Sequence, residues 1–202
     1  MGVSPSPYAL RITDHGMFDF SDAMERLIGH IRVSCGEFAH IEPERMVIAC
    51  MQTRSPGPHG IFASVQPLRF KGGSETMVRR GRTYAMPEIR RRGKEIFYIV
   101  YFALPRFMNM KFDAKLAAVF HELYHVSPEF NGDIRRFEGK YYAHGKSKKA
   151  YNEFVGKLSK EYLKLPGALE HTEFLRSDFK GLDKQFGGVS GLRVRSPKPR
   201  VI

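Results

Sequence analysis

The feature that most constrains the fold is a helical segment, residues 113–126, that is apolar on nearly every side. Asp113 opens it and Ser127-Pro128 ends it. A helix of this kind is stable only inside a protein, so other elements must cover it. Yet the same segment carries His121, Glu122 and His125. Buried polar side chains need partners, because their desolvation is otherwise costly.

Apolar segments on both sides of this helix can bury it. Apolar residues at helical spacing predict three further helices, at 19–34, 147–165 and 170–179. Runs rich in β-branched and aromatic residues predict three strands, at 46–51, 61–66 and 96–104. With 202 residues and 42% hydrophobic side chains, the chain can bury a core without disulfides. Its order of helix, strands and helices indicates an α+β fold.

The His-Glu-x-x-His spacing explains why polar residues belong on the buried helix. Residues four apart share one helix face, so His121 and His125 can reach the same metal ion. Glu122 lies one step round the helix, where it can take a proton from a water molecule beside the metal. This donor set favours Zn²⁺, and a catalytic zinc needs a third protein ligand and an open position.

Several downstream residues could be the third ligand. We favour His144, because Gly145 allows a tight turn and a loop of eighteen residues could bring the imidazole back over the helix. Asp133 is an alternative third ligand, or it could orient a ligand histidine. The other candidates are Glu129, Glu138, Glu153 and His171.

The sequence contains the run HELYH, then an eighteen-residue loop, then His144-Gly145 before an amphipathic helix. This arrangement resembles that of the SprT-like and related minimal zincins. The wider run HELYHVSPEFNGDIRRFEGKYYAHG is similar to metallopeptidases of phage and bacterial genomes. The resemblance covers residues 121–155 by motif and 95–165 by helix order. It implies a minimal zincin-like domain with a small mixed sheet, acting as a zinc-dependent peptidase. Its ligands would be His121, His125 and His144, and its general base Glu122.

The sequence departs from many SprT-like proteins in having no zinc ribbon, since Cys35 and Cys50 are its only cysteines. A role tied to DNA is therefore not implied by the resemblance. Peptide hydrolysis would also need a donor for the developing oxyanion. The sequence does not choose among four candidates: Arg135, Tyr141, Tyr142 and Tyr151.

Positive charge is concentrated in two segments of a chain whose net charge is +12. Nine basic residues lie between Arg69 and Lys94 against two acidic ones, and residues 187–202 hold four basic residues and no acidic one. This charge could form a solvated face or bind an acidic protein. It could also bind nucleic acid non-specifically. The residues for that last interaction are Arg79, Arg80, Arg90, Arg91, Arg92 and the C-terminal arginines.

We expect residues 1–186 to form a single domain and residues 187–202 a flexible basic tail. The chain begins without a secretory signal and contains no membrane-spanning run, which favours a cytoplasmic protein with free thiols. The alternative function is a non-enzymatic nucleic-acid-binding protein with a structural or vestigial metal site. Repressor-cleaving peptidases of mobile elements also carry His-Glu-x-x-His, but no helix-turn-helix domain is visible here.

Overall fold

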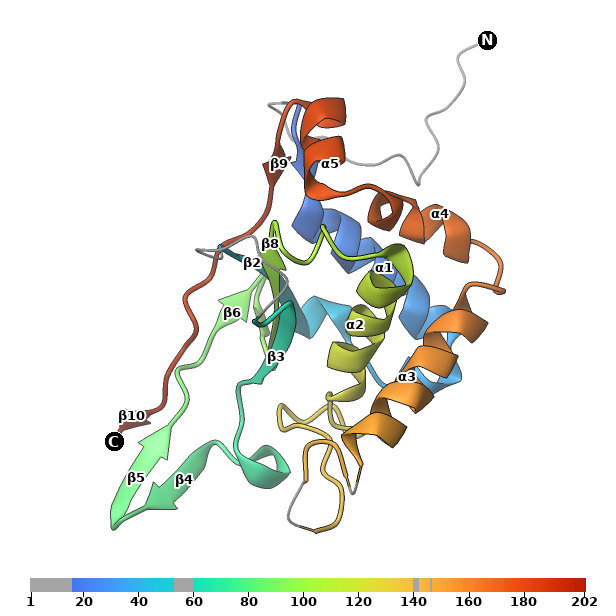
Figure 1. Ribbon diagram of the computed structural model, residues 1–202. Helices are drawn as coiled ribbons and strands as arrows, with labels where there is room; N and C mark the ends of the chain where they lie inside the picture. The colour runs from blue at the N-terminus through green and yellow to red at the C-terminus, as the bar shows by residue number, and fades with distance from the viewer. Residues whose placement is uncertain (1–15, 53–59, 140–141, 146) are drawn as a thin grey trace.

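A computed structural model describes residues 16–52, 60–139, 142–145 and 147–202 (Figure 1). A three-stranded sheet lies at its centre, in the order β2-β8-β3. β2 (Met46–Gln52) runs parallel to β8 (Tyr98–Leu104), and β3 (Ala63–Pro67) runs antiparallel to it. The expected small mixed sheet is therefore present, with β3 at one edge.

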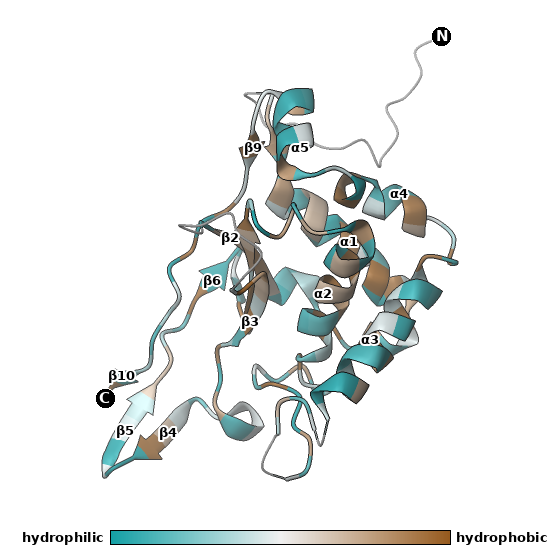
Figure 2. Cartoon of the chain, viewed as in Figure 1, coloured by the Kyte–Doolittle hydropathy of each residue, from teal (hydrophilic) through white to brown (hydrophobic). Residues whose placement is uncertain are grey.

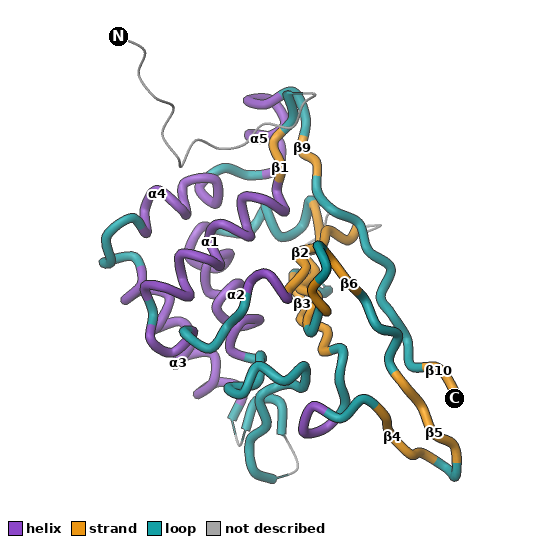
Figure 3. The backbone as a smooth tube through the Cα atoms, turned by 180° about the vertical axis from the view of Figure 1, so that it is seen from behind, coloured by secondary structure: helices purple, strands orange, loops and turns teal. Residues whose placement is uncertain are grey.

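The helices lie together on one side of this sheet (Figure 1, Figure 3). They are α1 (Phe20–Ser34), α2 (Phe112–Tyr124), α3 (Lys148–Tyr162), α4 (Ala168–Thr172) and α5 (Phe179–Phe186). Asp19 caps α1 by accepting the Asp22 N–H at 3.0 Å. Hydrophobic and hydrophilic residues alternate along α1 and α3, as in amphipathic helices (Figure 2).

The fold class is α+β, as the sequence indicated. The helices expected at 19–34, 113–126 and 147–165 are α1, α2 and α3. The segment expected to be helical at 170–179 contains most of α4 and a 3-10 helix, Glu173–Arg176. The sequence did not predict α5, whose apolar pattern is diluted by lysines and Gly181.

The central sheet has a hydrophobic cluster on each face, because side chains alternate along a strand. On β8, Tyr98, Val100 and Phe102 belong to the large core shared with the helices. Ile99 and Tyr101 belong to a smaller cluster on the opposite face. Both faces are thus covered, which explains why β8 reads as a continuous hydrophobic run.

Short strands complete the fold. β1 (Phe18–Asp19) pairs in parallel with β9 (Val189–Ser190). β4 (Thr76–Arg79), β5 (Arg82–Ala85) and β10 (Arg200–Val201) form an antiparallel sheet in the order β10-β5-β4. β6 (Arg90–Arg91) and β7 (Lys94–Glu95) form a separate hairpin.

Residues 187–202, which we expected to form a flexible basic tail, run along the domain from β9 to β10 (Figure 1). The Cys50 N–H donates to the Leu192 carbonyl at 2.7 Å. The Gln66 side chain donates to the Pro197 carbonyl at 2.6 Å. Val194 packs against the smaller hydrophobic cluster. The segment therefore covers the sheet face opposite the helices.

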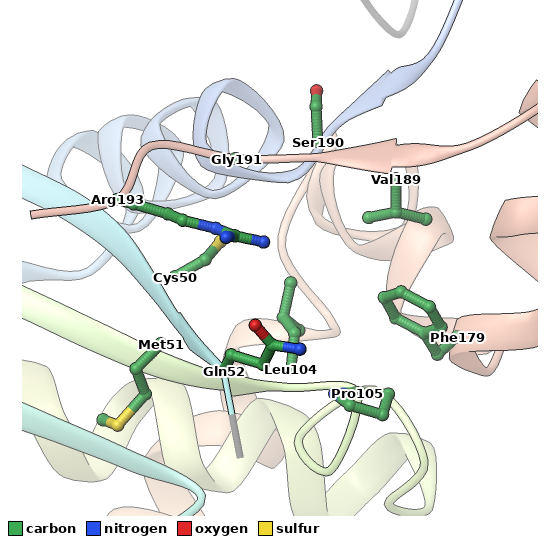
Figure 4. A pocket seen from close by; sticks show the side chains of 10 residues that line it. All are labelled: Cys50, Met51, Gln52, Leu104, Pro105, Phe179, Val189, Ser190, Gly191 and Arg193. Atoms are coloured by element: carbon green, nitrogen blue, oxygen red, sulfur yellow. The ribbon is translucent and has the colours of Figure 1, made fainter. Parts of the chain in front are cut away.

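A pocket of about 430 Å³ lies where this segment passes the end of β2 (Figure 4). Cys50, Leu104, Phe179 and Arg193 are among its lining residues, and Arg193 reaches towards Cys50. Burial raises the pKa of the Cys50 thiol to about 11. The thiol is therefore protonated at neutral pH and is a poor nucleophile. Both cysteines are free.

No helix in the described part of the chain combines the length and apolarity needed to cross a membrane.

Candidate metal centre

α2 brings two histidines together at its C-terminal end. His121 lies in the last turn, and His125 is the residue that follows the helix while keeping helical backbone angles. Their Nε2 atoms are 3.1 Å apart. The spacing of four residues thus places both imidazoles on one face, as the sequence predicted.

His144 reaches the same point from the other end of the loop that joins α2 to α3. Its Nε2 atom lies 3.3 Å from that of His121. The ligand atoms of all three histidines lie within 4.8 Å of one another. Gly145 follows at a φ of +67°, a left-handed conformation that favours glycine. Ser147 then caps α3 by accepting the Ala150 N–H at 3.2 Å.

Two of the three nitrogen–nitrogen separations match those expected around a small tetrahedral metal ion. Zn–N bonds of about 2.0–2.1 Å in a tetrahedron imply ligand nitrogens roughly 3.3 Å apart. The two Nε2 separations of 3.1 and 3.3 Å are close to that value. Burial, followed by neighbouring histidines, lowers the pKa of His121 to about 4 and that of His125 to about 3. The imidazoles are therefore neutral at physiological pH, which is the form that binds metal.

The other candidate ligands have different neighbours. Glu129 is exposed and accepts a hydrogen bond from Ser127. Glu153 is exposed on α3, with its carboxylate 3.8 Å from the Lys149 ammonium. His171 stacks on His30, with ring centroids 4.1 Å apart. Glu138 is exposed. His144 is thus the candidate that the fold brings to the pair.

Asp133 holds the loop after α2 in place. Its carboxylate accepts the backbone N–H groups of Gly72 and Ile134, each at 2.8 Å. It also pairs with the Arg136 guanidinium through bonds of 2.7 and 2.9 Å. Its backbone carbonyl accepts the Tyr98 hydroxyl at 2.8 Å. The carboxylate therefore bonds to the loop and its neighbours. None of these bonds involves His121, His125 or His144, the histidine triad.

Glu122 faces the edge strand of the central sheet. Its side chain is buried, and Oε2 accepts the Val65 N–H at 2.8 Å. Burial raises the pKa of this carboxyl to about 7, while the Val65 hydrogen bond acts in the opposite direction. A carboxylate that titrates near neutral pH can both accept and release a proton under physiological conditions.

Tyr151 of α3 packs against all three imidazoles. Its ring centroid lies 4.9, 5.3 and 5.0 Å from those of His121, His125 and His144. Its hydroxyl donates to the His121 carbonyl at 3.3 Å. The side chain of the next residue, Asn152, acts on the His121 imidazole and raises its pKa, against the larger effect of burial. The packing of Tyr151 restricts the orientation of all three rings.

Sequence reasoning missed Asn152 and the Val65 N–H, and it named Tyr151 only as an oxyanion donor. Of the other three donors, Arg135 braces the end of α2, donating to the Tyr124 carbonyl at 2.9 Å. Tyr142 is exposed, with the Arg136 guanidinium 4.8 Å from its ring centroid. Tyr141 lies outside the described residues.

Comparison with known proteins identifies a family that the chain matches. A family model described as "Putative phage metallopeptidase" matches residues 19–159. This range includes the three histidines, Glu122, α1, α2 and most of α3. Neither the curated proteins nor the solved structures give a match.

Proposed function

The chain belongs to the phage metallopeptidase family, and from that premise we propose that it is a zinc-dependent peptidase of the His-Glu-x-x-His type. His121, His125 and His144 would hold the metal, and Glu122 would act as general base. The observation that carries the proposal is the convergence of three neutral imidazoles beside a buried glutamate. One helix and the loop that follows it thus provide the metal ligands and the general base.

The choice of zinc follows from the donor set. Three clustered imidazole nitrogens suit Zn²⁺ better than the oxygen-preferring Mg²⁺ and Ca²⁺. A structural zinc is closed by four protein ligands, whereas this group of described residues offers three. A remaining position favours an enzyme over the alternative of a structural metal in a non-enzymatic protein. Zinc bound here would acidify a water molecule and polarise a peptide carbonyl.

Glu122 provides the proton transfers in this mechanism. Its carboxylate takes the proton of the attacking water and then delivers it to the amine of the departing peptide. Burial supports this role, because it raises the pKa of the carboxyl above its ordinary value and so favours uptake of the proton. Tyr151 holds His121 in place, because its ring packs against the imidazole and its hydroxyl donates to the His121 backbone carbonyl.

The edge strand β3 supplies a place for an extended substrate. Its register with β8 directs the backbone groups of Ser64 and Gln66 inward and those of Ala63 and Val65 outward. Pro67 occupies the next outward position, and proline is tolerated at sheet edges because it has no N–H. A peptide that pairs with this edge as an additional strand would lie beside Glu122.

Replacing Glu122 by glutamine tests the assignment. We expect Glu122→Gln to abolish cleavage of a fluorogenic peptide library while the protein still binds one zinc ion. Glu153→Gln is the matched control, because it makes the same chemical change on an exposed residue of α3. The control should cleave like the wild type. Unchanged cleavage by Glu122→Gln would remove the general-base assignment.

A further inference from the structure

Two hairpins in this chain have almost the same sequence and the same turn. Residues 79–82, Arg-Arg-Gly-Arg, join β4 to β5, and residues 91–94, Arg-Arg-Gly-Lys, join β6 to β7. The central residues have positive φ in both, 52° and 71° in the first, 51° and 77° in the second. These are the values of tight two-residue hairpin turns. Each turn sets two basic residues directly opposite one another, which destabilises a strand pair.

Three of the four basic residues of the second hairpin have acidic partners. The Arg91 guanidinium pairs with Glu25 of α1, and the Lys94 ammonium lies 3.2 Å from the Glu44 carboxylate. Arg90 pairs with Glu88 at 2.6 Å. We expected Arg90, Arg91 and Arg92 to be available to nucleic acid. The charges of Arg90 and Arg91 are balanced within the domain, whereas Arg92 is exposed and forms no ion pair with the described residues.

The first hairpin lacks such partners. It projects from the sheet side of the molecule, away from the helices (Figure 1, Figure 3). Arg79, Arg80 and Arg82 are exposed, and none forms an ion pair with any residue that the structure describes. The acidic residue nearby, Glu75, pairs with Arg69 at 3.1 Å. Three guanidinium groups therefore share one tip without internal compensation.

β10 adds the second basic segment to this hairpin. Arg200 pairs with Ala85 and Val201 with Tyr84, and the Ile202 N–H donates to the Thr83 carbonyl at 3.1 Å. Lys198 and Arg200 are exposed and form no ion pair within the described ranges. The two basic stretches, far apart in the sequence, thus meet in one three-stranded sheet. We call β4, β5 and β10, with the turn at 80–81, the basic arm.

We propose that the basic arm binds the phosphate backbone of nucleic acid, without reading its sequence. A polyanion would relieve the repulsion between Arg79 and Arg82, a task that acidic residues of the domain perform in the second hairpin. Phosphate contacts gain affinity through the release of counterions, charge by charge. The major groove also admits a two-stranded β-ribbon. Binding to an acidic protein is the alternative, and the poly-glutamate measurement below distinguishes the two.

Salt-dependent binding to DNA tests this proposal. The arm variant carries Arg79→Gln, Arg80→Asn and Arg82→Gln, with asparagine at the position of positive φ because it tolerates that conformation. The control removes three exposed lysines of α3 and α5 as Lys157→Gln, Lys160→Gln and Lys184→Gln. Both variants have the same net charge. A labelled DNA duplex of about 25 base pairs is titrated by fluorescence anisotropy between roughly 50 and 200 mM salt.

We expect the arm variant to bind at least about tenfold more weakly at the lowest salt, with a salt slope smaller by about three. The control should retain the wild-type slope. If the arm variant is unfolded by circular dichroism, the pair Lys198→Gln and Arg200→Gln replaces it, with an expected reduction of about two. Three results would each overturn the proposal: no binding by the wild type at low salt, equal losses in both variants, or equally tight binding of poly-glutamate.

Discussion

The Glu122 carboxylate accepts the backbone N–H of Val65 at 2.8 Å. This bond joins the helix that carries His121 and His125 to the edge strand of the central sheet. The acid–base group and the strand proposed to align a substrate therefore have a fixed relation to one another. The relation also has a thermodynamic consequence, because a buried carboxyl that must ionise lowers the stability of the folded chain.

Glu122→Gln should make the metal-free protein more stable above neutral pH. The wild-type carboxyl has a pKa of about 7 when folded, against an ordinary value of 4.5. The raised pKa therefore stabilises the folded chain, fully below pH 4.5, and this stabilisation is lost as the pH rises through 7. Glutamine does not titrate. The free energy of unfolding of the variant, relative to that of the wild type, should therefore be higher at pH 8 than at pH 5 by roughly 2–3 kcal/mol. Urea unfolding in the presence of a chelator measures the difference, and parallel pH profiles would contradict the pKa shift.

Zinc should stabilise the wild type but not variants that lack a triad histidine. Zinc at about one hundred times its dissociation constant should add about 2.7 kcal/mol to the free energy of unfolding. His125→Ala and His144→Ala should lose most of this gain and bind less than one zinc per chain. His171→Ala is the control, because that imidazole stacks on His30 instead. Thermal melting with and without zinc, together with metal analysis, checks the prediction. Full zinc binding by His144→Ala would transfer the third-ligand role to another residue.

Asp133→Ala should destabilise the protein and leave its zinc content unchanged. The substitution removes the acceptor of the Gly72 and Ile134 N–H groups and the partner of Arg136. Loss of a buried, hydrogen-bonded carboxylate of this kind costs about 3 kcal/mol. Urea unfolding and metal analysis of the same preparation separate the two effects. A normal midpoint with loss of zinc would show that Asp133 is a ligand.

Local spacing was enough to predict the two histidines of the candidate site that lie on α2. The distance of four residues between His121 and His125 determines their common face wherever the helix lies. The approach of His144 is different, because it depends on a folded loop, and its choice relied on Gly145 and on family resemblance. The contacts of Val65 with Glu122 and of Asn152 with His121 join different elements through tertiary packing. No local sequence pattern predicts them.

The charge pattern was also only partly readable. Sequence located the two basic segments, but it could not separate Arg91, which meets Glu25 of α1, from Arg80, which meets no acid in the described chain. The course of residues 187–202 along the domain could not be predicted from the sequence either. It depends on backbone hydrogen bonds to distant strands, which any sequence of suitable shape could form.

Truncation after Gly191 should therefore destabilise the domain. It leaves the Cys50 N–H without the Leu192 carbonyl and uncovers the cluster against which Val194 packs. The unpaired donor and the exposed apolar surface together should lower the free energy of unfolding by about 2–4 kcal/mol. Truncation after Pro199 is the matched control. It removes β10 alone, whose side chains are exposed, and should cost less than about 1 kcal/mol. Urea unfolding compares the two, and an unchanged midpoint for the longer truncation would show that the segment contributes nothing to the stability of the domain.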